Sequence, residues 1–138
     1  MSERTLVLVK PDGVARGLTG EVLRRIETKG YRVVALQLLS ATPELLAQHY
    51  AEHEGKPFYE PLVDFMSSGP VTAVVIEGHR CIGGFRALAG ATDPTAALPG
   101  TIRGDLASSM PDNLVHGSDS PESAAREIGL WFADDELV

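Results

Sequence analysis

The stretch Val71-Thr-Ala-Val-Val-Ile-Glu77 contains the longest apolar run of the 138-residue chain, and the turn residues Gly69-Pro70 come directly before it. A short run of β-branched residues bounded by turn residues is typical of a buried strand. The run is far shorter than the roughly 18 apolar residues of a membrane-spanning helix. We therefore interpret this stretch as the third strand of a sheet and expect no membrane association.

Three other segments have the character of strands. Residues 5–9 are a β-rich run that stops at the turn Lys10-Pro-Asp-Gly13, and residues 31–39 are rich in valine and leucine. Asn113-Leu-Val-His116 is short and β-like. Turn residues at the ends of apolar runs predict where each strand stops.

Helices are predicted between these strands, because capping residues precede segments with apolar positions on one face. Five helices are predicted, and they begin at Thr19, Thr42, Glu60, Arg80 and Ser120. The first helix ends at Gly30, the second runs to about His53, and the third ends at Gly69-Pro70. In the third helix, the side chains predicted to be buried are Leu62, Val63, Phe65 and Met66. The fourth is an unfavourable helix sequence at Gly83-Gly84, since glycine costs stability in a helix interior.

Residues 90–112 show no clear period and contain repeated glycine and proline. A loop of this length inside a compact domain usually carries function. The order strand, helix, strand, helices, strand, helix, short strand predicts an α+β sandwich with helices over a mainly antiparallel sheet.

The overall composition limits the class of protein. The length favours one domain, residues 1–138. The 12 basic and 19 acidic side chains give a net charge of −7, and nucleic-acid binding is not expected, because it relies on clustered cations. The single Cys81 cannot form an internal disulfide, and the N-terminus resembles no secretory signal, so we expect a cytoplasmic protein.

The segment His116-Gly-Ser-Asp-Ser120 is the clearest chemical feature. His116 leaves a short strand just before a Ser-capped helix, where backbone N–H groups favour anions. A neutral imidazole can attack phosphorus without a separate base. A lone histidine, however, is more often a structural one, and the segment by itself leaves that alternative open.

Wider motifs support the chemical interpretation. The segment Asn113-Leu-Val-His-Gly-Ser-Asp-Ser120 resembles the active-site signature of nucleoside diphosphate kinases. Eight further segments resemble the same family in order and spacing: Glu3-Arg-Thr-Leu6, Lys10-Pro-Asp-Gly13, His49-Tyr50, Lys56-Pro-Phe58, Ser68-Gly-Pro70, Thr92-Asp-Pro94, Pro99-Gly-Thr-Ile-Arg-Gly-Asp105 and Glu127-Ile-Gly-Leu-Trp-Phe132.

The resemblance implies a ferredoxin-like fold, a four-stranded antiparallel sheet with helices on one face. It also implies a ping-pong reaction, in which a nucleoside triphosphate gives its γ-phosphoryl group to His116 and a different nucleoside diphosphate collects it. The protein would then act mainly by positioning and charge neutralisation, as phosphoryl transfer requires.

The resemblance also assigns roles to particular residues. Lys10 would contact the transferred phosphate and the ribose 3′-hydroxyl, and Asn113 would also contact the ribose. The phosphates would be held by Arg86, Thr92 and Arg103. Phe58, Leu62 and Met110 would contact the base, and since stacking is indifferent to base identity, broad nucleotide specificity is expected. Tyr50, Ser118 and Glu127 would surround the nucleophile, with Glu127 holding one nitrogen of its ring.

The family also implies a cofactor and an assembly. Mg²⁺ would be held mainly by the nucleotide phosphates, with Asp119 at most an outer contributor. We expect a homo-oligomer, a hexamer slightly favoured over a tetramer. One departure is Pro111-Asp112, where many relatives have Gly-Arg, and this puts nucleotide affinity in question.

Two other functions are alternatives to this interpretation. A nucleotide-binding regulatory module without turnover is disfavoured, because every residue expected for catalysis is present. A metal-dependent hydrolase is disfavoured, because the chain lacks a carboxylate cluster suited to two metals. His49 and His53 are spaced like metal ligands but lack a third ligand in the sequence.

Overall fold

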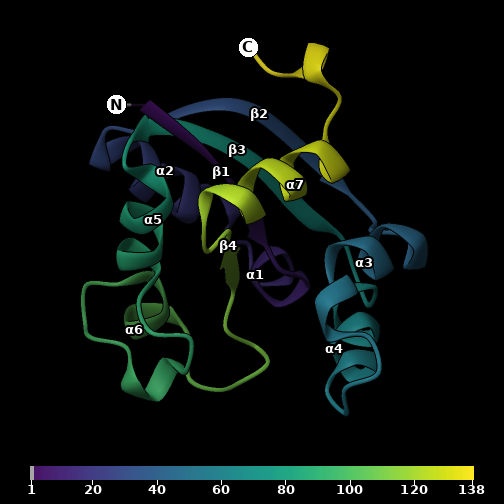
Figure 1. The fold of residues 1–138 in the computed structure, drawn as a ribbon. Helices are drawn as coiled ribbons and strands as arrows, with labels where there is room; N and C mark the ends of the chain where they lie inside the picture. The colour runs from purple at the N-terminus through teal and green to yellow at the C-terminus, as the bar shows by residue number, and fades with distance from the viewer. Residues whose placement is uncertain (1) are drawn as a thin grey trace.

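A computed structural model describes residues 2–138. Four antiparallel strands form one sheet in the order β2-β3-β1-β4. The strands are β1 (Ser2–Val9), β2 (Arg32–Leu39), β3 (Val71–His79) and β4 (Val115–Gly117). The helices are α1 (Pro11–Ala15), α2 (Thr19–Lys29), α3 (Pro43–His49), α4 (Tyr59–Met66), α5 (Cys81–Ala89), α6 (Ile102–Leu106) and α7 (Pro121–Trp131), with short 3₁₀ turns at Ala51–His53, Pro94–Ala96 and Asp134–Glu136. The predicted four-stranded α+β fold covered by helices is confirmed (Figure 1).

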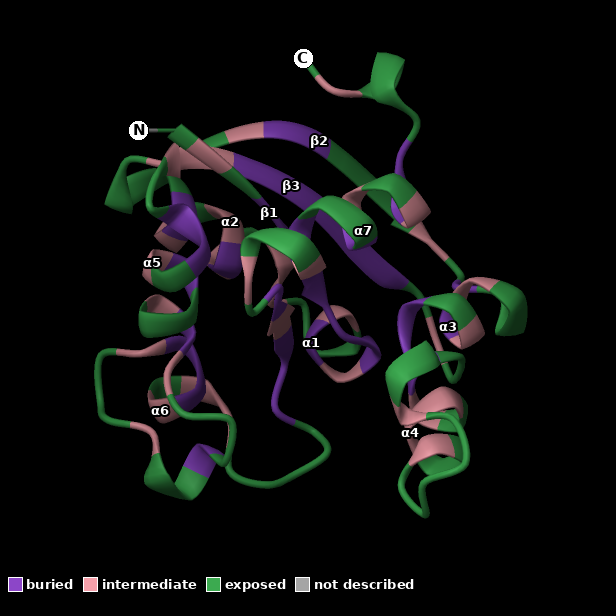
Figure 2. Ribbon diagram, viewed as in Figure 1, coloured by how far each residue is buried: buried purple, intermediate pink, exposed green. Residues whose placement is uncertain are grey.

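The central strands β1 and β3 are buried on both faces. Successive side chains of a strand point to opposite faces, so a continuous apolar run fills two cores. Leu6 and Leu8 of β1 face one core cluster, and Val7 and Val9 face the other. Figure 2 shows the resulting buried path along the middle of the sheet.

Helices accordingly cover both faces. Residues of α2 and α5, including Ile26 and Phe85, pack in one cluster, and residues of α3, α4 and α7, including Leu46, Met66 and Trp131, pack in the other. The expectation that helices would lie on one face only was wrong, because both faces of β1 and β3 are apolar.

Two short helices were missed. The predicted turn after Lys10 is α1, and the long segment 90–112 contains α6, whose N-cap Thr101 accepts a hydrogen bond from the Gly104 N–H at 2.9 Å. Each has five residues, too few for an apolar period to be visible.

Several predicted boundaries were also wrong. Strand β1 begins at Ser2, because it pairs with β3 as far as His79. Leu18, not Thr19, is the N-cap of α2, since the Thr19 hydroxyl lies 3.1 Å from the Thr72 hydroxyl instead. Helix α3 ends at His49, before a separate 3₁₀ turn.

The predicted burial of α4 was too extensive. Met66 is buried, whereas Leu62, Val63 and Phe65 are only partly so. The helix lies at the margin of its core cluster, so one face of it stays accessible.

No helix within residues 2–138 combines the length and the apolar character that crossing a bilayer would require.

Candidate active site

The strand register decides where His116 points. His116 of β4 pairs with Leu8 of β1, so both side chains lie on the face of the sheet that α7 covers. Glu127 of α7 meets the imidazole there, with its Oε1 3.0 Å from His116 Nε2. Because an ionised carboxylate only accepts hydrogen bonds, Nε2 carries the proton and Nδ1 keeps a free lone pair.

Glu127 is buried, with 6% exposure, and its carboxylate is held by a second donor. The Ser118 hydroxyl donates to the same Oε1 at 2.7 Å. Burial alone would raise the pKa of Glu127, but the hydrogen bonds that it accepts from His116 and Ser118 lower the pKa to about 2. The carboxylate therefore stays ionised and can fix the His116 tautomer.

A second histidine lies beside the first. The ring of His49, at the end of α3, makes a T-shaped contact with His116 at 4.9 Å, and its Nδ1 accepts from Trp131 Nε1 at 3.0 Å. Tyr50 follows directly and packs edge-on against His49 at 4.6 Å. Burial, and then the charge of Glu127, raises the pKa of Tyr50, so its phenol remains protonated.

Lys10 directly follows β1 and meets the segment before β4. Its Nζ donates to Asn113 Oδ1 at 2.8 Å, and its backbone N–H donates to Leu114 O at 2.8 Å. A side chain at Gly13 would disturb this approach, since a Cβ there would lie 3.2 Å from Leu114 O and 2.8 Å from a methyl of Val9. Burial lowers the pKa of Lys10 to about 8, Arg103 adding to the effect and Asp12 and Asp112 opposing it.

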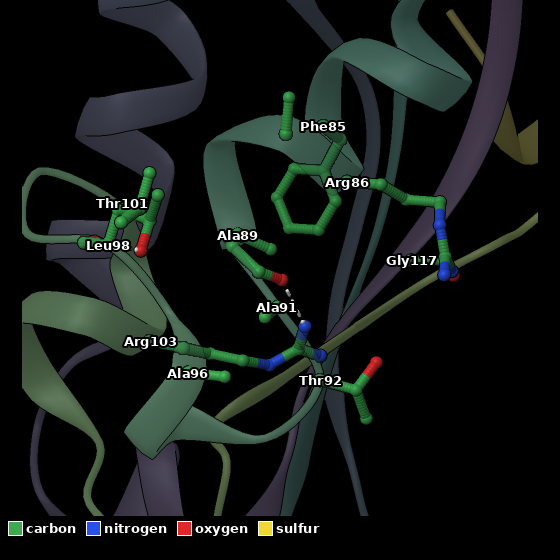
Figure 3. A pocket seen from close by; sticks show the side chains of 12 residues that line it. Phe85, Arg86, Ala89, Ala91, Thr92, Ala96, Leu98, Thr101, Arg103 and Gly117 are labelled. Carbon is green, nitrogen blue, oxygen red and sulfur yellow. Dashed lines mark hydrogen bonds between the residues drawn. The ribbon is translucent and has the colours of Figure 1, made fainter.

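Two guanidinium groups and a threonine border the site (Figure 3). Arg103 is buried and donates to three backbone carbonyls, those of Gly90, Asn113 and Val115, at 2.9, 3.1 and 2.6 Å. Burial, and then the charge of Arg86, lowers the pKa of Arg103 to about 10, so it remains a cation at neutral pH. Arg86 is exposed and donates to Gly117 O at 3.2 Å, leaving further donors for an anion.

These side chains surround one cavity of about 260 Å³. It contains most of the predicted catalytic and phosphate-binding residues: Lys10, Tyr50, Arg86, Thr92, Arg103, Asn113, His116 and Glu127. Ser118 is fully buried behind it. A neighbouring cavity of about 550 Å³ shares Arg86, Thr92, Arg103 and Gly117 with it.

The predicted base-binding residues lie outside the lining of this cavity. Phe58 and Met110 are 49% and 55% exposed, and Leu62 is partly buried. Phe58 packs edge-on against His53, and Lys56 Nζ lies 5.8 Å above its ring. An exposed aromatic ring near a cavity is suited to stacking.

Several residues that line the cavity were not predicted for the site, and His49 and Arg126 are the ones that bear on His116 and Glu127. His49 was quoted in the motif His49-Tyr50 and considered as a metal ligand, but no contact with the nucleophile was expected; its ring contacts that of His116, and Arg126 lies 3.7 Å from Glu127 Oε2. His49 lies in a quoted motif, where only Tyr50 was given a role, and Arg126 directly precedes the motif that begins at Glu127.

The donor set does not form a resident magnesium site. His49, His116 and Glu127 have ligand atoms within 4.8 Å of one another, but Mg²⁺ prefers six oxygens in an octahedron. Nδ1 of His49 and Nε2 of His116 are also already hydrogen-bonded. Asp119 lines the cavity and is exposed, so it is free to meet a cation that enters with a ligand.

An imidazole that is hydrogen-bonded to a carboxylate and lies in a cavity lined by cationic side chains, on an antiparallel α+β sheet, is typical of a phosphotransferase that works through a histidine. The family described as nucleoside diphosphate kinase matches residues 3–137. The chain belongs to the nucleoside diphosphate kinase family.

Individual members of the family are similar to this chain in sequence and in structure. Nucleoside diphosphate kinases of Mycolicibacterium paratuberculosis and Nocardia farcinica are 62% and 61% identical over 135 residues, which cover 97% of this chain and 99% and 97% of theirs. A solved structure of a family member from Babesia bovis has a TM-score of 0.96 at 48% identity, covering 99% of this chain and 92% of that one. The Halobacterium salinarum enzyme in complex with CDP has a TM-score of 0.97 at 51% identity, covering 100% and 92%.

Proposed function

We propose that His116 is the phosphoryl carrier of this kinase. Its Nδ1 attacks the γ-phosphorus of a nucleoside triphosphate, an N–P bond forms, and the P–O bond to the departing nucleoside diphosphate breaks. A second nucleoside diphosphate then attacks the phosphohistidine, and the N–P bond breaks as the new triphosphate forms. The observation that carries this proposal is the Glu127 contact at Nε2, which leaves the Nδ1 lone pair free.

The cations around His116 would neutralise the transferring group. We assign Arg86 and Thr92 to the phosphates, because both line the cavity and are exposed. Lys10 would contact the transferred phosphate, and its link to Asn113 at 2.8 Å would place that amide at the ribose. Arg103, tied to three carbonyls, would supply a fixed positive charge close to the phosphates.

The ligand is a nucleoside di- or triphosphate with its own Mg²⁺, so the metal arrives as part of the substrate. We propose that the base stacks on Phe58, with Leu62 and Met110 beside it, because these apolar side chains are accessible. Broad base specificity follows, since stacking reads no base edge. The CDP complex of the Halobacterium salinarum relative is consistent with this ligand class.

We also propose one domain over residues 1–138, a cytoplasmic location, and a homo-oligomer, with a hexamer slightly favoured. Support for self-association comes from β2, which is an edge strand of the sheet. Leu36 and Leu38 of this strand are 53% and 65% exposed. An exposed apolar edge strand invites pairing with another chain.

Incubation with γ-labelled ATP tests the proposal. We expect label on the protein that is acid-labile and that transfers to added GDP. His116→Ala should lose both properties, whereas His79→Ala, which removes an exposed histidine at the end of β3, should keep them. Label that persists in His116→Ala would refute the assignment.

A further inference from the structure

His49 is buried against the proposed nucleophile and has no role in the mechanism above. It is 3% exposed, and its ring contacts three others, those of Tyr50, His116 and Trp131. His116 contacts it at 4.9 Å and 71°, and Trp131 contacts it at 5.7 Å and 89°. Any movement of the His49 ring therefore changes the space available to the ring of His116.

Trp131 fixes the state of His49. The indole N–H can only donate, so Nδ1 of His49 must be the acceptor of the 3.0 Å hydrogen bond. The neutral ring then carries its proton on Nε2, which is buried and meets no acceptor among residues 2–138. An unpartnered buried N–H is unfavourable, so His49 carries a cost at Nε2 that is offset at Nδ1 by the hydrogen bond from Trp131.

His49 is also held neutral. The end of a helix ordinarily favours a cation, but burial, and then the charge of His116, lowers the pKa of His49 to about 3. A protonated His49 would compete with His116 for the carboxylate of Glu127. A neutral ring leaves Glu127 Oε1 to His116 and Ser118.

We propose that His49 is a positioning residue for phosphoryl transfer: its ring, held by Trp131, limits rotation of the His116 imidazole so that Glu127 keeps Nε2 and Nδ1 stays aimed into the cavity. A single hydrogen bond at Nε2 leaves the imidazole free to swing about that contact. The T-shaped contact with His49 restricts this swing of the His116 ring. The inference rests on the proposed role of His116 as phosphoryl carrier.

His49→Asn is the main test, because an asparagine side chain still offers Trp131 an acceptor but removes the ring beside His116. Small misplacements of a reacting group are costly, so we expect kcat with ATP and GDP to fall by about tenfold or more. The KM values should stay within about twofold, since substrate contacts are untouched. Gln48→Ala, an exposed neighbour on the same helix, is the matched control and should match the wild type.

A spectroscopic readout separates positioning from folding. In the ¹⁵N-histidine-labelled wild-type protein without nucleotide, NMR should detect His116 as a single tautomer with its proton on Nε2. In His49→Asn, at a temperature where circular dichroism finds the protein folded, we expect a mixture of tautomers. An unchanged His116 tautomer together with an unchanged kcat would overturn the proposal.

Trp131→Phe provides a second, independent variant. It removes the donor that holds His49, so kcat should fall in the wild-type background but not further in the His49→Asn background, because Trp131 acts through His49. Additive losses would overturn the inference. Failure of the proposed function is distinguishable, because then the wild type itself would form no acid-labile phosphohistidine, or His116→Ala would still form it.

Discussion

The hydroxyl of Ser118 donates to Glu127 Oε1 at 2.7 Å, and this is the same oxygen that lies 3.0 Å from His116 Nε2. Two donors thus share one acceptor atom, which fixes the carboxylate while it fixes the imidazole. Ser118 is also tied to the sheet, since its oxygen accepts the Leu6 N–H at 3.3 Å. The orientation of His116 therefore depends on a short chain of contacts that ends in β1.

Glu127→Gln should lower the rate of phosphoryl transfer strongly. The amide can present a donor instead of an acceptor to Nε2, and the reversed tautomer would place the His116 proton on Nδ1, where it blocks attack. Loss of such an orienting partner typically costs about 10- to 100-fold. Rapid-quench measurement of protein phosphorylation by ATP gives the rate directly.

Ser118→Ala serves as the graded comparison. It keeps the carboxylate charge and removes one donor to it, together with the acceptor of the Leu6 N–H, so we expect a loss of about threefold in the rate, in line with hydrogen bonds of modest net value. Equal losses in the two variants would contradict the view that Glu127 sets the tautomer and Ser118 only steadies it.

The alkaline limit of activity should follow Lys10. Its pKa in the free enzyme is lowered to about 8, chiefly by burial, so the ammonium loses its proton as the pH rises through that value. The profile of kcat/KM reports groups of the free enzyme and should fall on its alkaline side near there. Asp112 opposes the lowering of this pKa, so Asp112→Asn should move the alkaline limb to lower pH.

Asp112→Glu keeps the charge and is the control for that shift. Its alkaline limb should coincide with that of the wild type. A limb that does not move in Asp112→Asn would show that the carboxylate does not act on Lys10.

The strands were predictable because their apolar runs are dense, and the third strand is confirmed as β3. The two core faces follow from the same residues, since 71–76 is buried on both sides, whereas helices on one face were expected from the family resemblance alone. Helix α6 was missed, although Thr101 is a good N-cap residue, because a glycine-rich setting and a length of five residues hide it.

The site was predictable in content but not in geometry. His116 and Glu127 stand out through motifs, yet their meeting depends on the pairing of His116 with Leu8, a register that no local pattern specifies. The three carbonyl contacts of Arg103 depend on how segments 90–92 and 113–115 close on α6. His49 was undervalued because a single histidine on a helix gives no sign of the ring it will touch.

Replacing each of the two glycines of α5 by alanine should change the stability of the protein in opposite directions. A Cβ on Gly83 meets nothing within 4 Å, so Gly83→Ala should stabilise the protein by about 0.5–1 kcal/mol through helix propensity. A Cβ on Gly84 would collide with the phenol of Tyr31, so Gly84→Ala should destabilise by about 1–3 kcal/mol. Thermal unfolding of the two variants, at equal protein concentration, measures both. A rise in melting temperature for Gly84→Ala would refute the clash.

The edge strand β2 should control self-association. Leu36 and Leu38 pair with Val74 and Thr72 and so extend one face of the sheet to an exposed edge. Leu36→Lys with Leu38→Lys should reduce the mass measured by light scattering, because charges at an edge oppose strand pairing. Replacing the exposed Ser108 by lysine adds a charge elsewhere and should leave the mass unchanged. A monomeric wild type would contradict the proposed oligomer outright.

His49 should also make the fold sensitive to acid. Its pKa is about 3 in the folded state against an ordinary value of 6.5. Between these two pH values His49 is therefore protonated in the unfolded chain and neutral in the folded protein. The contribution of His49 to stability is therefore complete above pH 6.5 and is lost as the pH falls toward 3, with a slope of up to about 1.4 kcal/mol per pH unit. His49→Gln cannot titrate, so the difference in unfolding free energy between wild type and variant should change with that slope between pH 6.5 and 4.5, above the range in which Glu127 acts. Urea unfolding at a fixed protein concentration measures it, and two curves that stay parallel across this interval would mean that His49 accepts a proton in the folded protein.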